Sequence, residues 1–283
     1  MMSNDVVTNT PSVVPSLKNM SVAEIAALTG QEVSSNESQS LPRFAINHGE
    51  EDNEGRSIPR GEFSLKLPDG VTAYAKEAHL RIFFRLFTYS RWDAEQGTFG
   101  SQTIQAPNLS ADFYDTEGGM RCGRLTKSEA EGLAKDSPEM MLHKSVKCNQ
   151  ILYNTVQLVN PVDANGTKVD MPEEVPSVWY VRGSGFMPVS DHIKTIDRQK
   201  KIMCTSVNKV TTARRKMAGT SYFVPVISTL RYVDIKDSDQ DLIAKFFETK
   251  EAINNKVMGQ WRDQKEKKSK LGDLSDFGEV LSA

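Results

Sequence analysis

The chain has 283 residues, of which 25% are charged and 38% are hydrophobic, and its formal net charge at pH 7 is −2. This composition is ordinary for a globular protein with enough chain for a sizeable core, and no apolar run approaches the roughly 20 residues of a membrane span. The three cysteines, Cys122, Cys148 and Cys204, form no CxxC pair, which fits a reducing cytoplasm better than a disulfide scaffold. No basic segment followed by an apolar one stands at the N-terminus, so we expect a cytoplasmic protein.

Residues 1–40 are rich in Ser, Thr, Asn and Val and contain few large apolar side chains. We expect them to form a mobile arm. One short helix is predicted within it, at Ser21–Leu28, because Ser21 and Glu24 have capping-box spacing and Gly30 provides a stop.

A β-rich core is predicted from residue 41 to residue 235. Its opening reads as a meander, with strands in 41–48 and 62–67, the turn Pro68-Asp69-Gly70, and a long strand that ends near Trp92. Glycines and prolines interrupt 93–144, so this stretch is predicted to be an insertion with one helix, Lys127–Ala134. Further strands are expected at 145–161, 177–183, 201–213 and 220–234, and a helix at Pro188–Lys201 capped by Ser190.

The last part of the chain predicts a long helix. Leu242, Phe246, Ile253, Val257 and Trp261 follow one another at helical spacing within 236–270. Residues 271–283 carry acidic and no basic side chains, and we interpret them as an acidic tail. The predicted fold class is therefore α+β and β-rich: an OB-like curved sheet or barrel, a long C-terminal helix and mobile termini.

The long strand, Lys76 to Trp92, has two unlike faces when it is read with a period of two. One face carries Leu80, Ile82, Phe84 and Leu86, which is an ordinary core pattern. The other alternates basic and aromatic side chains: Arg81, Phe83, Arg85, Phe87, Tyr89 and Arg91. Guanidinium groups neutralise phosphates and aromatic rings stack on unpaired bases, so this face suggests single-stranded nucleic acid. The alternative is a strand buried on both faces, with each arginine paired to a carboxylate.

A second signal is an uneven distribution of charge. Between Arg198 and Val233 the chain has no acidic residue but eight basic ones, namely Arg198, Lys200, Lys201, Lys209, Arg214, Arg215, Lys216 and Arg231. Such segregation indicates an electrostatic footprint for a polyanion. A solvated basic loop is the alternative.

Signatures of an enzyme are missing from the sequence. It has no GxGxxG, GxxxxGK[ST], HExxH or GxSxG motif, and its four histidines are scattered singly. Cys122, His143, Cys148 and Cys204 could in principle form a zinc site, although they lack the short paired spacing of such sites. We therefore expect no enzyme and no cofactor.

The acidic tail with its D-L-S-D-F stretch, following a Lys-rich helix end, resembles the C-terminal tails of bacteriophage single-stranded DNA-binding replication proteins. The opening LPRFAINHGEEDNEGRSIPRGEFSL, followed by a long strand, is also similar to a family of mostly uncharacterised tailed-phage proteins. The resemblance covers the general layout from Leu41 to Trp261. It implies an OB-fold core and a tail that recruits replication partners and competes with DNA for the binding groove.

The sequence hypothesis is sequence-independent binding of single-stranded DNA in phage replication or recombination, with replication proteins as possible partners of the tail. The residues predicted to contact DNA are Arg81, Phe83, Arg85, Phe87, Tyr89 and Arg91 on the strand, and Arg198, Lys200, Lys201, Lys209, Arg214, Arg215 and Lys216 in the basic segment. A virion or assembly protein, whose long strand and C-terminal helix are interfaces, is the alternative.

Overall fold

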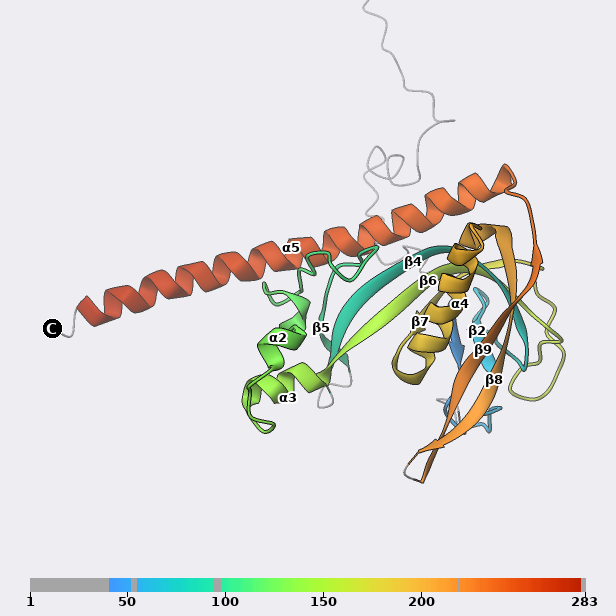
Figure 1. Ribbon diagram of the computed structural model, residues 1–283, viewed down its shortest axis with the longest axis horizontal. Coiled ribbons are helices and arrows are strands. Elements are labelled where there is room, and N and C mark those ends of the chain that lie inside the picture. Colours follow the sequence, from blue (N-terminus) through green and yellow to red (C-terminus); the bar gives the residue numbers. More distant parts are fainter. Residues whose placement is uncertain (1–40, 52–54, 94–97, 218, 281–283) are drawn as a thin grey trace, which may run out of the picture. The chain divides into compact units, whose positions relative to one another are not determined.

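The computed structural model describes residues 41–51, 55–93, 98–217 and 219–280, with side chains described as far as residue 270 except at 93, 98 and 99. The helix expected at Ser21–Leu28 lies outside these residues. Leu41–Ala283 forms one compact unit. Figure 1 shows its sheet and helices.

Nine strands of the described residues form a single sheet, ordered β3-β2-β1-β7-β6-β4-β8-β9, with β5 paired to β4. β1 and β7 are parallel, and the other pairings are antiparallel. The strands are β1 (Arg43–Ile46), β2 (Phe63–Lys66), β3 (Thr72–Ala75), β4 (Ala78–Asp93), β5 (Thr98–Gln102), β6 (Val146–Leu158), β7 (Val175–Val181), β8 (Ser206–Met217) and β9 (Thr220–Tyr232).

The sheet curls strongly into a half-barrel around the long strand β4 (Figure 1). β6 pairs with β4 along most of its length, whereas β8 pairs only with its first four residues and β5 only with its last four. The predicted fold class is thereby confirmed: a β-rich α+β chain with a curled sheet and a long C-terminal helix.

The helices are α2 (Lys127–Ala130), α3 (Pro138–Ser145), α4 (Phe186–Arg198) and α5 (Ser238–Val280), and the short 3-10 turns are η3 (Arg121–Gly123), η4 (Gly183–Gly185) and η5 (Met203–Thr205). Two sequence predictions are corrected. The N-cap of α4 is Gly185 and not Ser190, and α5 continues to Val280, through most of the predicted tail. In the described part of the chain, α5 is too polar and every other helix too short to span a membrane.

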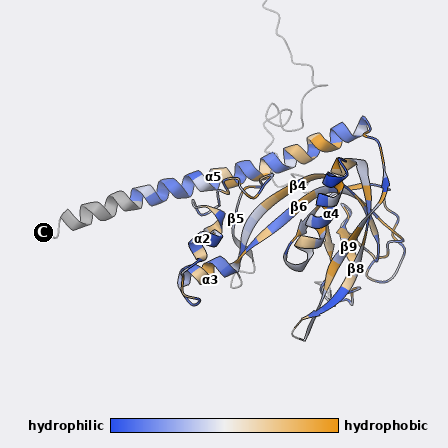
Figure 2. Cartoon of the chain, viewed as in Figure 1, coloured by the Kyte–Doolittle hydropathy of each residue, from blue (hydrophilic) through white to orange (hydrophobic). Residues whose placement is uncertain are grey.

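The helix α4 packs inside the curl. Its Val189 and Ile193 join Leu80, Ile82 and Leu152 of the sheet in the largest apolar cluster. Helix α5 crosses the opposite face of the sheet, and its buried Phe246 packs among Phe83, Leu86, Ile151 and Tyr153. Figure 2 shows a few hydrophobic turns near the start of α5, where it crosses the sheet, and mostly hydrophilic turns beyond them. Both faces of β4 are therefore covered.

A β-bulge in β4 changes which residues share a face. Ile82 pairs with Asn154 and Phe84 with Tyr153, so Phe83 is the extra residue of the bulge. Beyond it the alternation is inverted: Leu80 and Ile82 face α4 together with Arg85 and Phe87, whereas Leu86 faces α5. A strict period of two along the whole strand was therefore wrong, because one unpaired residue moves every later side chain to the other face.

A buried ion pair joins the centre of the sheet to the start of α5. Arg81 Nη1 and Nη2 donate to the two carboxylate oxygens of Asp239 at 3.0 and 2.8 Å, and both side chains are almost fully buried. Arg81 also donates to the carbonyl of Cys204 in η5. Burial opposes ionisation of Asp239, but the hydrogen bonds from Arg81 and from the backbone of Lys236 hold the pKa of this carboxyl below its ordinary value.

We expect Arg81→Met and Asp239→Leu each to lower the free energy of unfolding by about 3–5 kcal/mol, because each leaves the other charge buried and unpaired. The double variant should be more stable than either single variant, since it leaves no unpaired charge. Because the pKa of Asp239 is lowered by folding, the pair's stabilisation is complete at neutral pH and is lost as the pH falls below about 4. Urea unfolding between pH 3 and pH 7 measures both effects. Single variants as stable as the wild type would contradict the assignment.

Candidate nucleic-acid interface

Two of the three aromatic residues predicted to stack on bases, Phe83 and Phe87, lie in the protein core. Phe83 is 7% exposed and packs against Phe246 of α5, with ring centroids 5.6 Å apart. Phe87 is 6% exposed and contacts Phe186 of α4. Tyr89 is half-buried, with its ring at right angles to that of Phe113. Phe83 and Phe87 are therefore closed off from bases, because elements far along the chain cover both faces of the strand.

The arginines of β4 have partners within the protein. Arg81 is paired with Asp239, as described above. Arg91 pairs with Glu117 in the insertion. Arg85 has no carboxylate partner among the described residues; its Nε donates to Gln150 at 2.6 Å and its Nη2 to Ser190 at 2.5 Å. Burial accordingly lowers the pKa of Arg85. The alternative reading of this strand, buried on both faces, describes its structure better.

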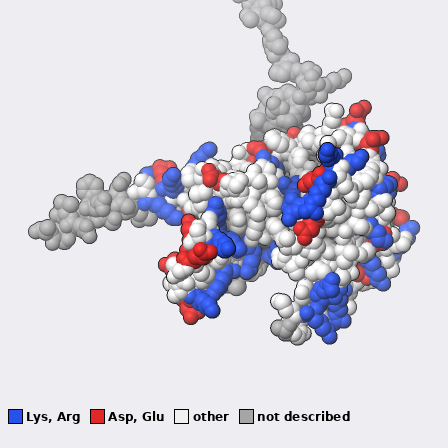
Figure 3. Space-filling model, in the orientation of Figure 1, with Lys and Arg blue, Asp and Glu red and all other residues white. Residues whose placement is uncertain are grey.

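The basic segment, by contrast, lies largely at the surface. β8 and β9 form a hairpin, here called the β8–β9 arm, whose far half extends beyond the pairing with β4. Arg214, Arg215 and Lys216 are exposed near its end, and none is paired with a carboxylate among the described residues. Figure 3 shows this cluster of blue side chains at the lower edge of the molecule. Arg214 donates from Nε and Nη2 to Ser221 Oγ, which leaves its charge uncompensated, and three such cations on one narrow arm are suited to phosphates.

The arm is fixed to the body by its contact with the turn before β2. Thr212 Oγ1 donates to the carbonyl of Gly61 at 2.5 Å, and Arg60 Nη2 donates to the carbonyl of Ser221 at 3.2 Å. Gly61 has a φ of +86°, and a Cβ atom there would lie 2.3 Å from the ring of Phe223. Only glycine therefore allows this close approach. The contact places the basic end of the arm at a defined position.

An aromatic residue that the sequence hypothesis did not include stands beside these cations. Tyr222 is half-buried and lies directly across the hairpin from Arg215. Phe223 is paired in the same way with Arg214, on the face that packs against Gly61. The alternation of basic and aromatic groups thus recurs on β8 and β9, across two strands. The pattern cannot be seen along one strand. Each arginine and its aromatic partner lie on different strands, about eight residues apart in sequence, and become neighbours only through the pairing register of β8 and β9.

The remaining predicted residues lie along or near the base of the arm. Lys200 and Lys201 line a cavity of about 340 Å³ together with Tyr232, and Lys201 Nζ lies 5.2 Å from the centre of that ring. Arg198 is exposed at the end of α4. Lys209 is half-buried and pairs with Glu77 at 2.5 Å, so its charge is compensated within the protein. The basic segment is thus spread along the arm, with Arg214, Arg215 and Lys216 at its far end and Lys200 and Lys201 at its base.

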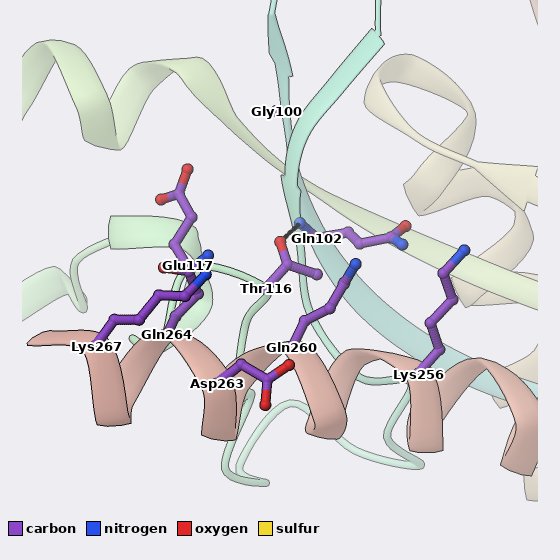
Figure 4. Close-up of a pocket in the computed structure, with 9 residues that line it drawn as sticks. All are labelled: Gly100, Gln102, Thr116, Glu117, Lys256, Gln260, Asp263, Gln264 and Lys267. Atoms are coloured by element: carbon purple, nitrogen blue, oxygen red, sulfur yellow. Dashed lines mark hydrogen bonds between the residues drawn. The ribbon is translucent and has the colours of Figure 1, made fainter.

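A second surface cavity, of about 420 Å³, lies between α5 and the end of the sheet (Figure 4). Lys256 and Lys267 reach into it from α5, but Asp263 and Glu117 line it as well. Its charges are therefore balanced, and it has no preference for a polyanion.

The possible zinc ligands do not gather. No three His, Cys, Asp or Glu side chains of the described residues are placed to hold a metal ion. Cys122, Cys148 and Cys204 are free thiols, and burial raises the pKa of Cys122 to about 12. A thiol with that pKa is protonated at neutral pH and is neither a ready ligand nor a nucleophile.

We expect Phe87→Ala to lower the free energy of unfolding by about 3–5 kcal/mol, because it empties a buried site between β4 and α4. Phe247→Ala is the matched control: Phe247 is 53% exposed, so its removal should change stability by no more than about 0.5 kcal/mol. Thermal or urea unfolding distinguishes the two. If Phe87→Ala is as stable as the control but binds oligo(dT) less tightly, the buried placement of this ring is wrong.

The surface best suited to a nucleic acid is thus the β8–β9 arm with the end of α4, and not the face of β4. It combines exposed cations, aromatic rings and an absence of acidic residues between Arg198 and Val233. Comparison with known proteins found no matching family model, no matching curated protein and no matching solved structure.

Proposed function

We propose that this protein binds single-stranded DNA without sequence preference, with the β8–β9 arm as its main contact. The observation that carries the proposal is the cluster of Arg214, Arg215 and Lys216, exposed and without carboxylate partners, beside Tyr222. Cations at this spacing follow a phosphate backbone, and a neighbouring aromatic ring offers a base a stacking surface. Duplex DNA presents the phosphates but hides the base faces.

The arm provides a path as well as a point of contact. β8 is 12 residues long, which corresponds to about 40 Å of extended strand. The basic cluster stands at one end of this path, and Lys200, Lys201 and Tyr232 stand at the other. None of these groups is arranged to read the edge of a base, so binding should be governed by backbone charge and stacking.

The half-barrel sheet supports the proposal by analogy. OB-folds bind oligonucleotides on a curved sheet and on loops that project from it, and the β8–β9 arm is a projecting hairpin of this kind. The resemblance to phage single-stranded DNA-binding proteins, and a role in phage replication or recombination, belong to the same proposal. So does the tail at 271–283 as a docking element for replication proteins.

One observation favours assembly as a second candidate function. β9 is an edge strand of 13 residues, and Val226 and Leu230 on it are almost half exposed. Exposed apolar edge strands pair readily with other chains. A stable oligomer that ignores oligo(dT) would favour this function over DNA binding.

The test is a fluorescence anisotropy titration with oligo(dT), matched duplex and RNA over a salt series. We expect the triple variant Arg214→Ala, Arg215→Ala, Lys216→Ala to bind oligo(dT) more weakly. The magnitude of the slope of log K against log salt should fall by about 0.7 for each lost phosphate contact.

The matched control is Lys66→Ala, Lys135→Ala, Arg262→Ala, which removes the same charge from exposed positions elsewhere. It should leave the slope nearly unchanged. A folded triple variant of the arm with the wild-type slope would remove the arm from the binding site.

A further inference from the structure

A cavity of about 580 Å³ opens beside the last residues of strand β4, between η3, α2 and α3. We call it the Arg121 cavity. Tyr89 lines the cavity and packs in the same cluster as Phe87 and Phe186 of α4. The cavity therefore lies on the face of the sheet that α4 covers. Its volume is in the range of small-ligand sites. It is separate from the β8–β9 arm.

Basic side chains dominate its lining. Arg121, Arg124 and Lys127 contribute positive charge, and Glu131 is the only carboxylate of the described residues that lines the cavity. Arg124 is held in place, since its Nη1 donates to the carbonyl of Val146 at 2.6 Å. Unlike the cavity of Figure 4, this one has an excess of cations. Such a lining favours an anion.

Arg121 carries a donor that the protein itself does not use. Its Nε is buried and has no hydrogen-bond partner among the described residues. A buried donor of a charged group is costly when it stays unpaired, and an anionic oxygen is the acceptor that suits a guanidinium best. Because Nε itself is inaccessible, it is not the contact atom, but it shows that the protein leaves this guanidinium of the cavity lining incompletely satisfied.

The backbone around Arg121 is fixed in an unusual conformation. Arg121 and Cys122 both have positive φ angles, 55° and 54°. The buried carboxylate of Asp115 holds this turn by accepting hydrogen bonds from the N–H groups of Glu117, Gly119 and Cys122 at 3.0, 2.9 and 2.9 Å. Backbone strain of this kind is common where a side chain is held for a ligand.

The cavity lining also has an aromatic and an apolar part, Tyr89 and Leu109. The ring of Tyr89 is fixed by its perpendicular contact with Phe113, with centroids 4.9 Å apart. Burial raises the pKa of Tyr89, so its hydroxyl group is protonated and can donate at neutral pH. A ligand that fits must combine an anionic group with a flat or apolar part.

We propose that the Arg121 cavity binds a nucleotide, with Arg121 and Arg124 on its phosphate and Tyr89 and Leu109 beside its base. The nucleotide has two sources, a free mononucleotide or the phosphorylated end of a strand. The inference does not rest on the β8–β9 arm and extends the interactions of the protein beyond it.

Isothermal titration calorimetry of the full chain with thymidine 5′-monophosphate, thymidine and inorganic phosphate tests the proposal. The monophosphate should bind, and thymidine should bind at least tenfold more weakly. Arg121→Met should lower the affinity for the monophosphate at least tenfold. Lys135→Met, a control at an exposed position nearby in the chain, should leave this affinity unchanged. Equal binding of monophosphate and thymidine, no binding of the monophosphate, or wild-type binding by Arg121→Met would overturn it.

If Arg121→Met fails to fold, Lys127→Met replaces it, since Lys127 is exposed and lines the same cavity. A severalfold loss of affinity supports the proposal, and no loss contradicts it. The two sources are separated by oligo(dT) with and without a 5′-phosphate in competition with the monophosphate. Binding of the monophosphate should be unchanged in the triple variant of the arm, so failure of one proposal leaves the other open.

Discussion

The contact on which the rest of the structure depends is the buried ion pair between Arg81 and Asp239. It ties the middle of the half-barrel to the first turn of α5 and, through the carbonyl of Cys204, to the segment that begins the β8–β9 arm. Two charges buried this deeply are tolerated only because each satisfies the other. With α5 fixed here, Phe246 covers the face of β4 that would otherwise be open to a ligand.

The position of the arm follows from the same arrangement. The pairing of β8 with β4 ends at Val210, because its partner Ala78 is the first residue of β4. The arm then extends past β4 until it meets the turn at Gly61. The cations at its far end, Arg214, Arg215 and Lys216, have no carboxylate partner among the described residues, whereas Lys209 near its base is paired with Glu77. The two proposed sites thus share one cause: basic side chains that the fold positions but does not neutralise.

Much of the fold was predictable from local pattern. The strands of the meander, the hairpin of the basic segment and the helix around Phe246 have the periodicity and turn residues that define such elements. What could not be read locally is which faces other elements cover. From the sequence, Phe83 and Phe87 resemble exposed rings that stack on bases. The rings that bury them, Phe246 and Phe186, lie about a hundred residues or more away in the chain, so no local pattern reveals the contact.

The bulge at Phe83 was the second obstacle, since one unpaired residue inverts the alternation of the strand. Of the candidate site, the sequence located Arg214, Arg215 and Lys216 through the absence of acidic neighbours. It missed Tyr222, whose place beside Arg215 depends on the hairpin register.

The central claim, that DNA follows the arm and not β4, is tested most directly by photo-crosslinking with bromodeoxyuridine-substituted oligo(dT) and mapping of the adducts. We expect adducts on β8 and β9, foremost at Tyr222; adducts confined to other parts of the chain would contradict the account.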